Sequence, residues 1–142
     1  MPDLASTVAD VVETSARELA RQRGIVIMAA PRTLVIANRA SFRDYVRQRF
    51  LAEPVGVVID CTAAEYIDSS GVALLFALAK DARRAGIGYC VSCLSADLRA
   101  LVNLTRIDTV VPMTDALHEG ILAASLGVPP GEIDTARSGD IT

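Results

Sequence analysis

The sequence predicts one α/β domain, in which a mixed, mostly parallel sheet of about five strands packs against helices, with an additional helix at the N-terminus. Short runs of β-branched and aliphatic residues alternate along the chain with longer segments of helical periodicity. After an opening pair of strands, a helix follows each strand, and such crossover connections join parallel strands. The chain has 142 residues, of which 51% are hydrophobic, which suffices for a single core.

The first element is an amphipathic helix over residues 4–22, which Gly24 ends. Its apolar positions fall near one face and include Leu4, Val8, Val11, Val12 and Leu19. Two interpretations fit this stripe: the helix covers the domain's own core, or it forms the contact of a homodimer. We therefore divide the chain into an N-terminal helix extension (1–24), a folded domain (25–126) and a flexible C-terminal tail (127–142).

Two strands are expected next, Ile25–Ala29 and Thr33–Ala37, joined as a hairpin by a turn at Pro31-Arg32. Ser41 then has the character of an N-cap, and a helix is expected to continue to about Leu51. This opening hairpin is the reason for expecting a mixed sheet.

The strand at 55–61 has a continuous apolar character, which favours burial on both faces. A helix over Ser69–Arg84 follows it. Its exposed face is expected to be polar at the far end, at Lys80, Asp81 and Arg84. Near its start the same face carries Ala73 and Ala77, with Leu74 at the margin, and these small apolar residues form a candidate docking surface. Alternatively, the alanines pack under a neighbouring loop.

The remaining pattern predicts a strand over Ile87–Leu94, a helix capped by Ser95 and a short strand over Thr109–Met113. A final helix is expected to be capped by Thr114 or Asp115.

Charge and apolar runs exclude several classes of function. The net charge of −3 shows no basic surplus, so we expect no nucleic-acid binding. No apolar run reaches the roughly 18 residues of a membrane helix, so we expect no membrane insertion. The first residues lack the layout of a signal peptide, and we expect a cytoplasmic protein.

Cysteine and histidine content indicates no metal site and no cofactor. Cys90 and Cys93 have the spacing of a CxxC motif, but residues three apart in a strand point to opposite faces. We expect buried, unreactive cysteines; a redox pair between Cys61 and one of these across adjacent strands is the alternative. His118 is the only histidine and is expected on a helix surface.

The stretch Asp68-Ser69-Ser70-Gly71 lies between the strand at 55–61 and the following helix. Asp, Ser and Gly are favoured at helix N-termini because their side chains or backbone satisfy the free amides of the first turn. A hydroxyl at this position also lies at the positive end of the helix dipole, where an added phosphate is stabilised. The serines are therefore either helix caps or a modification site.

Asp60, followed by Tyr66-Ile67-Asp68-Ser69-Ser70-Gly71-Val72, resembles the signature of the STAS domain of bacterial anti-sigma-factor antagonists. The resemblance covers roughly residues 25 to 125 and implies a STAS-like fold. It also implies that Ser69 is phosphorylated by a partner anti-sigma factor with serine-kinase activity, with Ser70 as the alternative site. A phosphatase would then restore the unmodified form.

On this resemblance, unphosphorylated Ser69 lies in a surface that binds the anti-sigma factor, and phosphorylation releases the partner by charge repulsion. Asp68 would orient the Ser69 hydroxyl, and Asp60 would either support the loop with Ser70 and Gly71 or merely end its strand. The chain lacks the Gly-Glu-Leu-Asp-like segment that antagonists commonly carry, here around Asn38-Arg39-Ala40.

Two other classes of function remain. That missing segment and the N-terminal helix favour a non-switching STAS scaffold, such as a stressosome-like subunit or a transporter-associated protein. An enzyme is disfavoured, because the sequence has no Gly-x-Ser-x-Gly elbow and no Gly-x-x-x-x-Gly-Lys loop, and its histidine has no evident link to Ser69.

Overall fold

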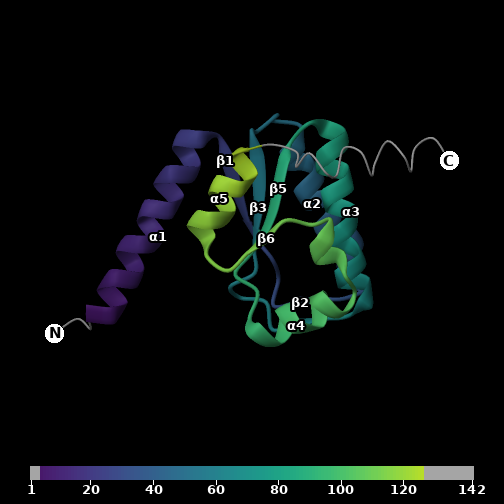
Figure 1. Ribbon diagram of the computed structural model, residues 1–142. Helices are drawn as coiled ribbons and strands as arrows, with labels where there is room; N and C mark the ends of the chain where they lie inside the picture. Colours follow the sequence, from purple (N-terminus) through teal and green to yellow (C-terminus); the bar gives the residue numbers. More distant parts are fainter. Residues whose placement is uncertain (1–3, 127–142) are drawn as a thin grey trace.

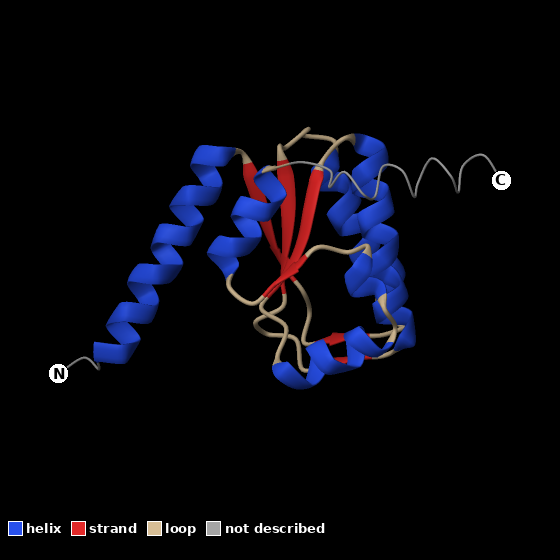
Figure 2. Cartoon of the chain, viewed as in Figure 1, coloured by secondary structure: helices blue, strands red, loops and turns tan. Residues whose placement is uncertain are grey.

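The computed structural model describes residues 4–126 and has a parallel β-sheet at its centre (Figure 2). Four strands pair in the order β1 (Ile25–Ala29), β3 (Gly56–Asp60), β5 (Gly88–Ser92) and β6 (Met113–Thr114), and every pairing is parallel. The predicted α/β class with a mostly parallel sheet is confirmed. The central strand β3 is buried on both faces, as its continuous apolar run predicted.

The helices form two layers, one on each face of the sheet (Figure 1). One face packs against α2 (Arg39–Phe50), α3 (Ser69–Ala85) and α4 (Ala96–Leu104). The other face packs against α1 (Leu4–Arg23), the predicted N-terminal helix, and α5 (Leu117–Ser125). Alternation along β3 supplies both cores, because Val57 and Ile59 point toward α3 whereas Val58 points toward α5.

The predicted opening hairpin does not form. The strand β2 is only Thr33–Leu34, and it pairs in parallel with β4 (Tyr66–Ile67) in a separate two-stranded sheet, while β1 pairs with β3. Pro31 and the loop around it carry the chain away from the main sheet instead of turning it back. The small β2–β4 sheet ends immediately before Asp68 and therefore positions the start of α3.

The ends of the later elements follow local signals in part. Gly86 ends α3 with a left-handed φ of 73°, and Ser95 caps α4 by accepting from the Leu98 amide, as predicted. The strand expected over 109–113 is instead a 3₁₀ turn, η1 (Ile107–Thr109), followed by β6. Neither Thr114 nor Asp115 caps α5; the cap residue is Ala116. The predicted tail lies outside the described residues.

Candidate functional site

Asp68 is the N-cap of α3 and ties that helix to the loop after β2. Its Oδ1 accepts a hydrogen bond from the Gly71 amide at 2.9 Å, and its Oδ2 accepts one from the Ile36 amide at 3.2 Å. The Asp68 amide donates in turn to the Leu34 carbonyl at 3.1 Å. One side chain thus holds two loops that are distant in the sequence, and its carboxylate is engaged by backbone amides.

Ser69 and Ser70 are the first two residues of α3, and the capping role belongs to Asp68. The Ser69 side chain is exposed, and that of Ser70 is half-buried. Within residues 4–126, neither hydroxyl makes a hydrogen bond, and the amides of both serines are unpaired. The hypothesis that these serines act only as helix caps is therefore wrong, and the first turn of α3 retains free N–H groups beside an accessible hydroxyl.

Gly71 is required by the close approach of β2. A Cβ atom at this position would lie 2.2 Å from the Leu34 carbonyl oxygen and 2.8 Å from Cγ2 of Ile67. Any larger residue would therefore push α3 away from the β2–β4 sheet. Asp68 and Gly71 thus fix the start of α3 against the β2–β4 sheet, and the two serines between them are exposed and half-buried.

Exposed apolar side chains occur on the elements that flank the two serines. Ile36 is 72% exposed on the loop held by Asp68, and Tyr66 is 56% exposed at the start of β4. Ala73 and Phe76 are exposed on the next turns of α3, where the Lys80 ammonium lies 5.3 Å from the Phe76 ring centroid. We call Ile36, Tyr66, Ala73 and Phe76 the apolar rim.

The predicted docking surface on α3 needs one correction. Ala73 is exposed and Ala77 half-exposed, but Leu74 is fully buried in the core beneath the helix. The helical turn places Leu74 toward the sheet, so it cannot contact a partner. Ile36 was missed because its place beside the start of α3 depends on the β2–β4 pairing, which has no local sequence signal. Tyr66 was named only as part of the motif, and its exposure is not evident from the sequence.

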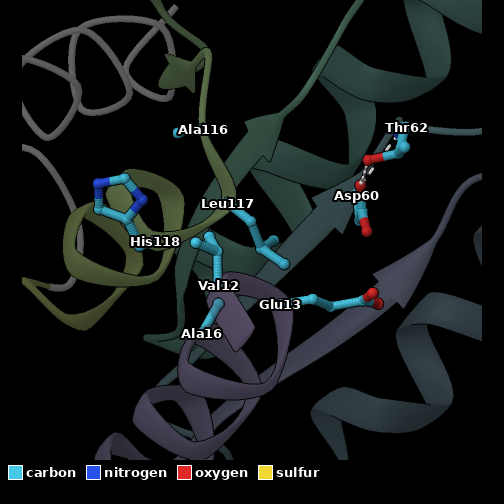
Figure 3. A pocket seen from close by; sticks show the side chains of 8 residues that line it. All are labelled: Val12, Glu13, Ala16, Asp60, Thr62, Ala116, Leu117 and His118. Atoms are coloured by element: carbon cyan, nitrogen blue, oxygen red, sulfur yellow. Dashed lines mark hydrogen bonds between the residues drawn. The ribbon is translucent and has the colours of Figure 1, made fainter. Parts of the chain in front are cut away.

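Asp60 does not join this site. Its Oδ1 accepts hydrogen bonds from the Thr62 amide at 3.0 Å and the Thr62 hydroxyl at 2.6 Å, so it shapes the turn after β3. Its side chain lines a cavity of about 520 Å³ between α1 and the start of α5, on the face opposite α3 (Figure 3). Glu13 and His118 line the same cavity. His118 therefore lies on the α5 side of the sheet, away from Ser69.

A partly buried ion pair fixes α2 against α3. Asp81 was expected on the exposed side of α3, but only 8% of its side chain is exposed, and the Arg43 guanidinium donates two hydrogen bonds to it, each of 2.9 Å. The hydrogen bond to Asp81 raises the pKa of Arg43. This pair holds α3, and so the serine-bearing turn, in a fixed orientation.

The cysteines are free, as expected for buried thiols. Cys61 and Cys90 are buried and Cys93 is half-buried. Burial raises the pKa of Cys61 to about 12, with smaller contributions from Asp60 and Cys93, so its thiol is unreactive at neutral pH. No group of three or more potential metal ligands occurs among residues 4–126, and no helix in that range is long and apolar enough to cross a membrane.

Solved structures share this architecture. A candidate anti-sigma factor antagonist from Thermotoga maritima superposes with a TM-score of 0.62 at 21% identity, over 71% of this chain and 87% of that chain. An anti-sigma-factor antagonist (STAS) domain protein from Planctomyces limnophilus gives 0.63 at 20% identity, over 72% and 92%. A sulfate transporter family protein from Wolinella succinogenes gives 0.63 at 15% identity, over 72% and 86%.

These likenesses show the fold, which antagonists and transporter proteins share. The family follows from the sequence match, because the STAS domain family model matches residues 16–120. That range includes the second half of α1, both small strands and the serine-bearing turn. This chain belongs to the STAS domain family.

Proposed function

We propose that this protein is a cytoplasmic anti-sigma-factor antagonist that Ser69 phosphorylation switches off. The observation that carries the proposal is the state of Ser69: it is exposed at the first turn of α3, its hydroxyl is free of partners in the described chain, and Asp68 already supplies the cap. A kinase can therefore modify Ser69 without removing an interaction that holds the helix.

The apolar rim supports a protein partner for the unmodified form. Ile36, Tyr66 and Phe76 are exposed on the elements that flank Ser69 and offer the apolar and aromatic contacts that dominate protein interfaces. The partner is an anti-sigma factor with serine-kinase activity, which would hold Ser69 in its active site while it contacts the rim.

Phosphorylation would change the electrostatics of this surface more than its fold. A phosphate adds nearly two negative charges beside the Asp68 carboxylate, on a chain whose net charge is already −3. The unpaired amides of Ser69 and Ser70 and the helix dipole stabilise the modified state locally. Binding a partner over the rim would then require desolvation of the phosphate, and each 1.4 kcal/mol of that cost weakens binding about tenfold.

The first experiment is intact-mass analysis with site mapping of the protein purified from its own host, under growth and stress conditions. We expect phosphate on Ser69 in the wild type and in a Ser70→Ala variant, and none in Ser69→Ala. Ser69→Asp should lose at least about tenfold in affinity for the co-purifying anti-sigma factor. A chain without phosphate in every condition would overturn the switch.

A second function, a non-switching STAS scaffold, is favoured by a different observation. The murine Solute Carrier 26 family member A9 anion transporter contains a comparable fold, with a TM-score of 0.63 at 16% identity, over 72% of this chain and 18% of that chain. The scaffold predicts an unmodified protein recovered in a large assembly from its host, and no effect of Ser69→Asp on that assembly.

A further inference from the structure

The cavity between α1 and α5 lies at the carboxyl edge of the parallel sheet. Asp60 is the last residue of β3, and Thr62 follows it in the next loop. Ala116 and Leu117 follow β6 at the start of α5, and α1 closes the cavity from another side (Figure 3). In parallel α/β sheets, ligands bind outside the carboxyl ends of the strands. The cavity is therefore at the place where this kind of sheet offers a ligand site.

The cavity has the size and the walls of a small-molecule site. Its volume of about 520 Å³ falls within the range of roughly 300–1,000 Å³ that is typical of such sites. Apolar side chains form much of the wall, and they include Val12 and Ala16 of α1 and Leu117 of α5. Val12 is 54% exposed, so the apolar part of a ligand would remove this side chain from water.

The charged groups of the cavity are acidic. In Figure 3, Glu13 and Asp60 lie on one side of the apolar residues and His118 lies on the other. Among the described residues that line the cavity, none is Lys or Arg. Glu13 pairs with Arg17 at 3.1 Å on the exposed surface of α1, whereas the hydrogen bonds of Asp60 within residues 4–126 come from Thr62. The cavity therefore favours a positively charged ligand over an anion.

The donor set suits an organic cation better than a metal ion. The part of the chain that the structure describes has no group of three or more potential metal ligands, and apolar walls cannot complete a coordination shell. An ammonium group has three donors, and two carboxylates can accept them. We propose that the cavity binds a small organic cation, with its ammonium group between Glu13 and Asp60 and its apolar body against Val12, Ala16 and Leu117. Such a ligand would link α1 to the ends of β3 and α5.

A titration of the full chain, followed by amide NMR shifts, tests the proposal. The probe is phenethylammonium; phenethyl alcohol and hydrocinnamate are matched to it and carry the same phenylethyl body on a neutral and on an anionic group. We expect the ammonium probe to shift the amides of Val12, Thr62 and Leu117. The alcohol should bind at least about tenfold more weakly, and the carboxylate should not bind. Absence of shifts with millimolar phenethylammonium, equal binding of all three compounds, or tighter binding of hydrocinnamate or Mg²⁺ would overturn the proposal.

Conservative variants test the position of the ammonium group. Glu13→Gln and Asp60→Asn each remove one charge but keep an acceptor oxygen, so the turn at Thr62 is retained. Each should weaken phenethylammonium binding about threefold and the double variant about tenfold, since partly exposed ion pairs contribute modestly. Asp44→Asn is the matched control and should leave binding unchanged, because Asp44 is exposed on α2 at the opposite face of the sheet. The amide spectra also show whether each variant folds. A folded double variant that binds as tightly as the wild type, or an equal loss in Asp44→Asn, would contradict the assigned position.

Discussion

Replacing Asp68 by alanine tests whether the cap and the modification site are separate residues. The change removes the acceptor for the Gly71 amide and the acceptor for the Ile36 amide together. Loss of an N-cap costs about 1 kcal/mol, and the second, solvent-exposed hydrogen bond adds about as much, so we expect about 2 kcal/mol of lost stability. Asp68→Asn keeps one acceptor oxygen and should lose about half of that.

Urea unfolding followed by far-UV circular dichroism measures these changes, since the chain contains no tryptophan. With a typical m-value of about 2 kcal/mol/M, Asp68→Ala should lower the midpoint by about 1 M. Ser69→Ala is the control and should stay within about 0.5 kcal/mol of the wild type. If Ser69→Ala were the more costly change, the serine would be the cap and the argument for a free hydroxyl would be refuted.

Three further changes test the frame around the site. Arg43→Met should lower the free energy of unfolding in urea by about 3 kcal/mol, because it leaves the buried Asp81 carboxylate without its main partner. Asp81→Leu should lower it less, because the Arg43 guanidinium that remains reaches solvent. Equal losses for the two variants would contradict this explanation. Gly71→Ala should destabilise the fold by about 1–3 kcal/mol, because the added Cβ clashes with the Leu34 carbonyl of β2. Gly86→Ala should cost about 1–2 kcal/mol through its left-handed backbone alone. Only Gly71→Ala should therefore also alter the amide NMR shifts of the β2–β4 sheet. Burial raises the pKa of Cys61 from 9.0 to about 12, so the unfolded chain loses this proton at a lower pH than the folded chain. The free energy of unfolding should therefore fall as the pH rises from about 9 to 12. Cys61→Ala should flatten that fall, and an unchanged slope would exclude the thiol as its source.

Local signals in the sequence predicted the elements that depend on neighbouring residues. The buried strand β3, the start of α3 after Asp68 and the end of that helix at Gly86 all follow from periodicity and capping chemistry. The Ser95 cap was found in the same way. At the site, the motif itself was sufficient to place Ser69 at the first turn of a helix.

Features that depend on non-local pairing could not be predicted. The strands β2 and β4 are two residues each, too short to show a period, and only their pairing brings the loop of Ile36 to the start of α3. Asp81 has the polarity of a surface residue, and its burial depends on Arg43 reaching it from another helix. A carboxylate buried by a distant partner leaves no mark in its own segment.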